Sequence, residues 1–189
     1  MKINLFRFVI AGLLICAVSL VLWAATPPAV GDKAPDFTLK TLDDQTVKLS
    51  DLTSSGKVVL VVLRGYPGYQ CPFCERQVKD FINLASSFAD ANTRVIMVYP
   101  GPADELKAHA KEFIDNKQWP KEFYFVIDPG YNMISSYGLR WDARHETSYA
   151  STFVLDRNAI IRYAKISHSH GDRAKAADIM DEVKRIAEK

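Results

Sequence analysis

The chain has 189 residues, of which 48% are hydrophobic and 24% charged, and its formal net charge is +2. This length and apolar content indicate one globular domain with a substantial core and exclude a disordered chain. Lys2 and Arg7 lie in an N-terminal leader without acidic residues, so 22 basic residues remain to balance the 22 acidic ones. Because the sequence contains no basic cluster, we expect no nucleic acid partner.

The leader covers residues 1–25 and is apolar and uncharged over residues 8–25. A basic start followed by such a run is typical of a signal peptide or a single membrane anchor. The run reaches the roughly 17 residues that a spanning helix needs, which favours an anchor, whereas Ala24 and Ala25 would permit cleavage. Either alternative predicts an exported, periplasmic or otherwise extracytoplasmic protein, anchored in the inner membrane if residues 8–25 are kept. Cys16 is then an apolar residue of this segment.

Two prolines and a Gly-Asp pair predict an extended linker over residues 26–33, and the remaining residues, 34–189, form the predicted domain. Hydrophobic periodicity predicts the elements of this domain in chain order. Strands are expected at 36–41, 46–49, 58–63, 94–98, 123–127, 152–155 and 160–164, and helices at 74–91, 103–117, 132–137 and 174–187. Strands that alternate with helices predict an α/β fold with a mixed central sheet covered on both faces. This layout resembles a thioredoxin fold with additional N-terminal strands.

The sequence Cys71-Pro-Phe-Cys74 joins the buried strand at 58–63 to an amphipathic helix. Free backbone N–H groups and the positive end of the helix dipole favour a thiolate there, and we expect Arg64 and Arg76 to strengthen that field. We therefore interpret the pair as a reactive dithiol that opens and closes a Cys71–Cys74 disulfide. Half of a zinc site and an inert structural bridge are the alternatives, although no second cysteine pair completes a zinc site.

Three segments of the chain resemble the peroxiredoxin family, in particular its alkyl hydroperoxide reductase and thiol-specific antioxidant branch. They are Val-Gly-Asp-Lys-Ala-Pro-Asp-Phe-Thr-Leu at 30–39, the dithiol loop, and the two strands near the C-terminus. The family signature, Pro-x-x-x-Thr/Ser-x-x-Cys, places Pro67 in the proline position and Cys74 as the peroxidatic cysteine. Cys71 then stands in the Thr/Ser position. The arginine that the family carries before the 152–155 strand is replaced here by Ala150.

An arginine elsewhere in the chain would have to take over that role. Arg64, Arg140 and Arg144 are the candidates on the sequence. Pro67, Arg64, Tyr66 and Arg76 are the residues expected to support the dithiol and shape its surroundings.

The resemblance implies a thiol-dependent peroxidase without a cofactor. Cys74 would attack a hydroperoxide, Cys71 would resolve the sulfenic acid as a disulfide, and an external thioredoxin-like dithiol would reduce it. A second hypothesis is a membrane-anchored thiol-disulfide oxidoreductase, in which Cys71 attacks protein disulfides and Cys74 resolves the mixed disulfide. A third, of a different class, is a copper-binding protein in which His168 and His170 join the two thiols. We expect no metal under the first two hypotheses.

Overall fold

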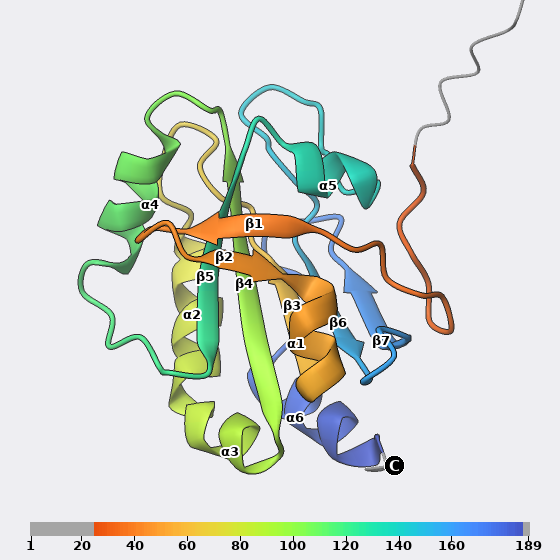
Figure 1. The fold of residues 1–189 in the computed structure, drawn as a ribbon. Helices are drawn as coiled ribbons and strands as arrows, with labels where there is room; N and C mark the ends of the chain where they lie inside the picture. The colour runs from red at the N-terminus through yellow and green to blue at the C-terminus, as the bar shows by residue number, and fades with distance from the viewer. Residues whose placement is uncertain (1–24, 187–189) are drawn as a thin grey trace, which may run out of the picture.

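Strands from both halves of the chain pair into one mixed sheet, with helices packed on both of its faces (Figure 1). The computed structural model describes residues 25–186, in which the sheet has seven strands in the order β2-β1-β5-β4-β3-β6-β7. The strands are β1 (Thr38–Thr41), β2 (Thr46–Lys48), β3 (Lys57–Val62), β4 (Thr93–Gly101), β5 (Phe123–Pro129), β6 (Ser151–Leu155) and β7 (Ile161–Ile166). The helices are α1 (Leu49–Ser55), α2 (Pro72–Asn83), α3 (Ala85–Asp90), α4 (Leu106–Ile114), α5 (Asn132–Ser136) and α6 (Ala176–Arg185).

The central strands β3, β4 and β5 are parallel, and the outer strands pair antiparallel to them and to each other. All six residues of β3 are buried, which is the pattern of a strand covered on both faces. The predicted α/β fold with a mixed central sheet and flanking helices is therefore confirmed.

The side chains of β3 alternate between two hydrophobic cores. Val58, Leu60 and Val62 belong to a core that α1 and α5 cover, whereas Val59 and Val61 belong to a core under α2, α3, α4 and α6. Both cysteines of the dithiol lie in the second core. The site is therefore built on one defined face of the sheet.

The helices differ from the prediction around α1, α2 and α3. The chain forms α1 directly after β2, where no helix was predicted, because Leu49 and Thr53 bury one side of a helical turn. The predicted helix at 74–91 is two helices, α2 and α3, because the backbone leaves the helical conformation at Leu84 (φ −107°, ψ 14°). The helix also begins earlier than predicted, since Pro72 occupies its first position.

Strand β4 was predicted to stop before Tyr99 but continues through Pro100 to Gly101. Proline lacks a backbone donor and is tolerated where no neighbouring strand needs one. The Pro100 carbonyl accepts a hydrogen bond from the Tyr66 N–H, in the loop that follows β3. The paired part of β3 ends at Val62, opposite Val98. No residue of β3 therefore loses a hydrogen bond because Pro100 lacks an N–H group.

The stretch predicted as a linker, 26–33, lies against the start of β7. The Gly31 N–H donates to the Ile161 carbonyl, and the Ile161 N–H donates to the Asp32 carbonyl, each over 2.9 Å. The division of the chain into leader, linker and domain stays a prediction, because residues 1–24, including Cys16, lie outside the described residues. In the described part of the chain, no helix has the length and apolar character needed to cross a membrane.

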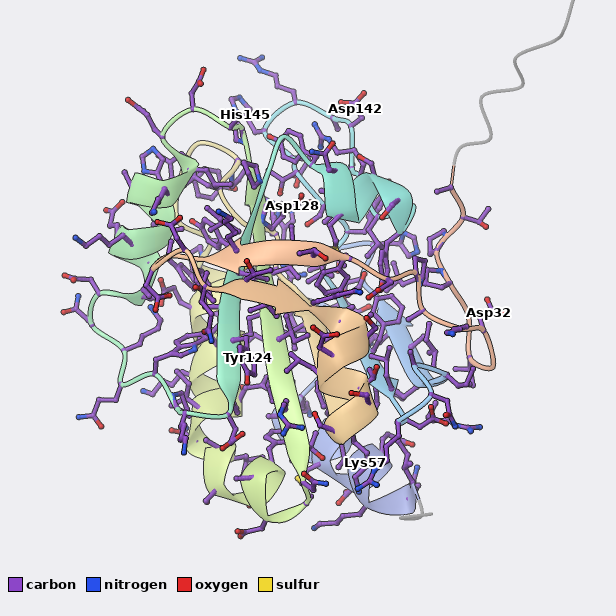
Figure 2. All side chains as sticks on the ribbon, in the orientation of Figure 1. Asp32, Lys57, Tyr124, Asp128, Asp142 and His145 are labelled. Atoms are coloured by element: carbon purple, nitrogen blue, oxygen red, sulfur yellow. The ribbon has the colours of Figure 1, made fainter. Side chains whose placement is uncertain are left out.

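The parallel strands end at the same edge of the sheet, and loops gather there. Asp128, near the end of β5, lies at this edge together with Asp142 and His145 of the loop before β6 (Figure 2). Lys57, at the start of β3, lies at the opposite end of the molecule (Figure 2). The dithiol follows β3 and so belongs to the loop-rich edge.

Candidate active site

The loop that carries the dithiol runs across the end of β4. The Leu63 N–H donates to the Val98 carbonyl over 2.9 Å, and the Tyr66 N–H donates to the Pro100 carbonyl over 3.0 Å. Gly65 lies between these bonds with φ +69°, and a Cβ there would sit 1.9 Å from the Pro100 oxygen. Only glycine fits this approach, so the path of the loop to Cys71 is fixed by the backbone.

The two thiols occupy the first turn of α2. Cys71 is the N-cap residue in an extended conformation, Pro72 opens the helix, and Cys74 follows within the first turn. Their exposed fractions are 1% for Cys71 and 0% for Cys74. Both are present as free thiols, so the predicted Cys71–Cys74 disulfide stays a prediction.

The surroundings of Cys71 favour its thiolate. A hydrogen bond from the Cys74 thiol lowers the pKa of Cys71 to about 5, against the opposing effect of burial. The backbone N–H groups of Cys74 and Phe73 and the charge of Arg173 lower it further. These contacts therefore favour ionisation of Cys71.

Cys74 has the opposite character. The hydrogen bond to Cys71, burial and the negative charge of the Cys71 thiolate raise the pKa of Cys74 well above its ordinary value. Arg173 and a backbone hydrogen bond from Arg64 oppose this rise without cancelling it. In the reduced pair, these contacts favour the thiolate at Cys71 and the protonated thiol at Cys74.

The arginines expected to act on the thiols have other partners. The Arg64 side chain pairs with Glu146 and reaches the dithiol only through its backbone. Arg76 is exposed, and its guanidinium carbon lies 4.6 Å from the centre of the Phe73 ring. The charge that lowers the pKa of both thiols belongs to Arg173, in the loop between β7 and α6, which the sequence pattern did not mark.

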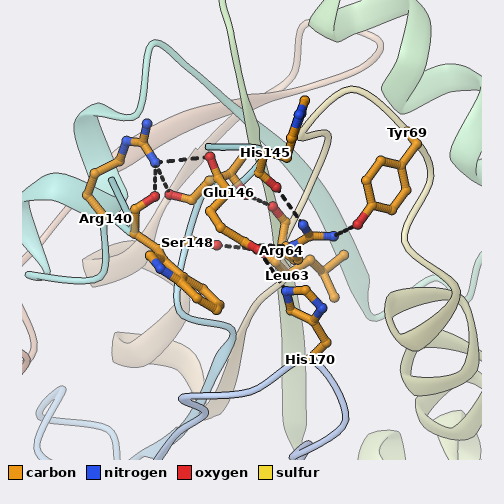
Figure 3. A network of polar contacts seen from close by, with 10 residues as sticks. Leu63, Arg64, Tyr69, Arg140, His145, Glu146, Ser148 and His170 are labelled. Atoms are coloured by element: carbon orange, nitrogen blue, oxygen red, sulfur yellow. Dashed lines mark hydrogen bonds and ion pairs between the residues drawn. The ribbon is translucent and has the colours of Figure 1, made fainter. Parts of the chain in front are cut away.

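A polar network centred on Arg64 joins three loops beside the dithiol (Figure 3). Arg64 Nε donates to Glu146 Oε2 over 2.7 Å, Nη1 donates to the Tyr69 hydroxyl over 2.7 Å, and Nη2 donates to the His145 carbonyl over 2.6 Å. The second Glu146 oxygen lies 2.9 Å from His170 Nε2. The network therefore links the β3–α2 loop, the loop before β6 and the loop after β7.

The other two arginine candidates lie in the loop before β6. Arg140 donates to the Thr147 carbonyl over 2.6 Å and so braces the loop before β6. Arg144 is exposed. Ala150, at the position where the family carries arginine, is buried.

Tyr66 and Gln70 attach the loop to α4. The Tyr66 ring stacks on the His109 ring, with 3.6 Å between their centres. Gln70 Nε2 donates to the His109 carbonyl over 2.9 Å, and the Tyr99 hydroxyl donates to Gln70 Oε1 over 2.7 Å. Burial and the nearby Cys74 raise the pKa of Tyr99. The predicted support from Tyr66 is thus a contact to α4, and half-buried Pro67 follows it in the same loop.

The histidines of the copper hypothesis are engaged elsewhere. His170 pairs with Glu146, and the His168 ring lies 5.1 Å from the Tyr149 ring. Across residues 25–186, no three or more His, Cys, Asp or Glu residues are gathered as a metal site would require. The copper hypothesis therefore gains no support from the described residues.

Comparison with known proteins relates this chain to one protein family and to two kinds of named relative. Residues 30–164 match the AhpC/TSA family. Peroxiredoxin Q, chloroplastic, of Oryza sativa subsp. japonica is 30% identical over 133 residues, which are 70% of this chain and 57% of the relative. Thiol-disulfide oxidoreductase ResA of Halalkalibacterium halodurans is 29% identical over 110 residues, which are 58% of this chain and 57% of the relative. The match thus spans 57% of the length of each relative.

A solved structure supports the fold. Peroxidoxin BcpB from Mycobacterium tuberculosis superimposes with a TM-score of 0.65 at 22% identity, covering 84% of this chain and 98% of that one. The predicted resemblance to the peroxiredoxins within the thioredoxin superfamily is confirmed. Both named classes of relative are oxidoreductases, so the predicted enzyme class is also confirmed.

Proposed function

Because this chain belongs to the AhpC/TSA family, we propose that it reduces small hydroperoxides through the Cys71–Cys74 dithiol, and that Cys71 attacks first. The observation that carries this proposal is the pairing of an ionised Cys71 with a protonated Cys74 inside a covered site. With only 1% of Cys71 exposed, a small oxidant reaches the sulfur more readily than a folded protein does. The peroxiredoxin relatives support a hydroperoxide as that oxidant.

The proposed chemistry has two steps. The Cys71 thiolate attacks the terminal oxygen of the hydroperoxide, the O–O bond breaks, and the leaving oxygen takes a proton and departs as an alcohol or water. Cys71 becomes a sulfenic acid. The Cys74 sulfur then attacks Cys71, a disulfide forms, and water leaves.

The second step benefits from the coupling between the thiols. The Cys71 thiolate is the reason that Cys74 keeps its proton, because its negative charge and the hydrogen bond both raise the pKa of Cys74. Once Cys71 is oxidised, that charge is gone, and Arg173 favours the Cys74 thiolate. Oxidation of the first thiol therefore activates the second.

This assignment reverses the roles that the family signature implied. The signature places the peroxidatic cysteine at Cys74, whereas the hydrogen bonds and charges around the pair favour Cys71 as the thiolate. The reason is the thiol in the Thr/Ser position. A Ser or Thr hydroxyl at this position would keep its proton and donate a hydrogen bond to Cys74. The Cys71 thiol, at the helix N-cap, loses its proton before Cys74 does and accepts the hydrogen bond from Cys74 instead.

Thiol–disulfide exchange is a second candidate. The same order of pKa values suits a dithiol whose first cysteine attacks a disulfide and whose second resolves it, and a ResA-type relative supports it. In either case an external thioredoxin-like dithiol is the proposed partner that exchanges electrons with the pair.

Stopped-flow kinetics on the reduced protein test the function. Hydrogen peroxide and a small protein disulfide are offered separately to the parent, Cys71→Ser and Cys74→Ser. We expect the parent to consume peroxide, Cys71→Ser to be inactive, and Cys74→Ser to react once and stop as a sulfenic acid that a dimedone probe traps. A parent that ignores peroxide but reduces the disulfide would establish the second candidate. Activity retained in Cys71→Ser would restore Cys74 as the attacking thiol.

We further propose that the protein works outside the cytoplasm, held to the inner membrane through residues 8–25 if the leader is not cleaved. The apolar, uncharged leader supports this location. Fusion of the leader to alkaline phosphatase, which is active only after export, tests the location. An inactive fusion in a cell that exports a control fusion would contradict it.

A further inference from the structure

The loop before α6 forms one wall of the dithiol site. The backbone of Gly171 passes so close to Phe73 that a Cβ there would sit 3.3 Å from the ring. Gln77 Nε2 donates to the Ala174 carbonyl over 3.5 Å, and Ala174 belongs to the same core as Cys71 and Cys74. Residues 171–174 therefore lie against the first turns of α2.

Arg173 brings unused hydrogen-bond donors to this wall. Its Nε and Nη2 groups are buried and have no hydrogen-bond partner. A buried donor without a partner is costly, and a ligand, reacting atom or water that accepts a hydrogen bond from it removes that cost. Arg173 lies between Gly171 and Ala174, which contact Phe73 and Gln77 of α2, and its charge lowers the pKa of both Cys71 and Cys74.

An unused acceptor lies on the same interface. Gln77 is 5% exposed, and its Oε1 atom is buried without a hydrogen-bond partner. Gln77 follows Cys74 by three residues and so shares its helix face. Its amide nitrogen is held by Ala174, next to Arg173, which fixes the direction of the side chain. Two donors and one acceptor therefore remain open between α2 and the 171–174 segment.

This set matches the bonding of a hydroperoxide, which offers two acceptor oxygens and one O–H donor. We propose that Arg173 and Gln77 bind the oxygen atoms of the hydroperoxide that the Cys71 thiolate attacks. This inference rests on the proposed function and adds two catalytic residues to it. Arg173 takes the part that Arg64 and Arg76 were expected to play, from a different element of the fold.

The residues act as follows. Gln77 Oε1 accepts a hydrogen bond from the terminal O–H, and Arg173 donates to the leaving oxygen. The sulfur electron pair forms the S–O bond, the O–O bond breaks, and sulfur is oxidised by the two electrons that the peroxide gains. Negative charge develops on the leaving oxygen, where the guanidinium group stabilises it until a proton from water completes the alcohol or water product.

Two measurements on the reduced protein test this inference. The first is the thiolate absorbance near 240 nm as a function of pH, which reports the Cys71 pKa without any turnover. The second is the rate constant for hydrogen peroxide at a pH above that pKa, where every variant is ionised. The variants are Arg173→Gln, Arg173→Lys and Gln77→Met, with Arg157→Gln, at an exposed position in the turn between β6 and β7, as the matched control.

We expect Arg173→Gln to raise the Cys71 pKa by about one unit and to slow the reaction about tenfold even when the thiol is fully ionised. Arg173→Lys should have a Cys71 pKa close to that of the parent, because lysine keeps the positive charge. Its reaction should still be slower than that of the parent, because lysine lacks the planar pair of donors. Gln77→Met should leave the pKa unchanged and lower the rate several-fold. Arg157→Gln should change neither.

Each alternative outcome has a distinct meaning. If Arg173→Gln alters only the unfolding midpoint, with pKa and rate unchanged, the open groups hold water only and the inference is overturned. Equal rates for Arg173→Lys and the parent would reduce the role of Arg173 to its charge and overturn the proposed contact to oxygen. A parent that does not consume peroxide refutes the proposed function itself, and the titration then still decides whether Arg173 stabilises the thiolate.

Discussion

Arg64 and Glu146 form a buried ion pair, with 2.7 Å between Arg64 Nε and Glu146 Oε2, although they lie 82 positions apart in the chain. The side chains are only 2% and 11% exposed. Burial by itself would raise the pKa of Glu146, but hydrogen bonds from Arg64 and His170 outweigh it and lower the pKa. The pair therefore locks the β3–α2 loop onto the loop before β6.

We expect Glu146→Gln to lower the free energy of unfolding by about 3 kcal/mol at pH 7, because it leaves the Arg64 charge buried without its counter-ion. The ionised Glu146 contributes fully above the ordinary carboxyl pKa of 4.5, and its contribution is lost as the pH falls through the lowered pKa. The difference between variant and parent should therefore shrink below pH 4. Urea unfolding at pH 7 and at pH 3.5 measures both values.

Asp142→Asn is the matched control in the same loop. Asp142 is 92% exposed and lies 3.3 Å from Arg140, so its removal should change stability by less than about 0.5 kcal/mol. Equal losses for Glu146→Gln and Asp142→Asn would show that the buried pair does not hold the loops together.

Gly65 provides a second test of how the loop is held. Gly65→Ala places a Cβ 1.9 Å from the Pro100 oxygen at φ +69°, and we expect a loss of at least about 3 kcal/mol from clash and strain together. Gly68→Ala, in the same loop at φ +114°, meets no atom within 4 Å and should cost about 1 kcal/mol from strain alone. Urea unfolding compares the two variants. A loss in Gly68→Ala as large as in Gly65→Ala would mean that the approach to β4 does not set the loop.

The sequence was sufficient to predict the dithiol and the sheet, because both are local patterns. Continuous apolar character identified β3, and helical spacing after Cys74 placed the thiols at the start of α2. The sequence was not sufficient to identify the groups that tune the thiols. Arg173 follows β7 in a stretch without periodicity, and its nearness to Cys71 arises only when α6 packs beside α2.

The misplaced elements also have tertiary causes. Pro100 is a strand breaker in sequence terms, yet it continues β4 because the neighbouring strand has ended on that side. Arg64 precedes the dithiol by a few residues and was expected to face it, but Glu146 offers a buried counter-ion on the other side of the loop. Partners that are distant in the chain decide where these side chains point.

Tyr99 and Gln70 give a third prediction. The Tyr99 hydroxyl donates to Gln70 Oε1 over 2.7 Å, directly before Cys71. Tyr99→Phe leaves that acceptor without its donor and should lower stability by about 1 to 2 kcal/mol. Because the loop is then less firmly held, we expect iodoacetamide to alkylate the covered Cys71 several-fold faster at pH 7, as followed by mass spectrometry. Tyr124→Phe, on the opposite face of the sheet, is the control and should leave the alkylation rate unchanged.

Unchanged alkylation in Tyr99→Phe, together with unchanged stability, would show that the hydrogen bond does not restrain the loop. Faster alkylation in both variants would assign the effect to general loosening of the fold.

The dependence of Cys71 on Cys74 gives the most direct prediction. The Cys74 thiol is the largest cause of the lowered pKa of Cys71, about 5, so Cys74→Ala should raise that pKa by one unit or more. Cys74→Ser keeps an O–H donor of similar position and should raise it less. Since only the thiolate reacts, the alkylation rate of Cys71 should rise with pH through about 5 in the parent and through a higher value in Cys74→Ala.

A parent midpoint near the ordinary thiol value of about 8.5 would contradict the proposed roles of both cysteines. Midpoints in both variants equal to that of the parent would instead assign the low pKa to the helix N-terminus and Arg173, because these contributions remain when the Cys74 thiol is removed.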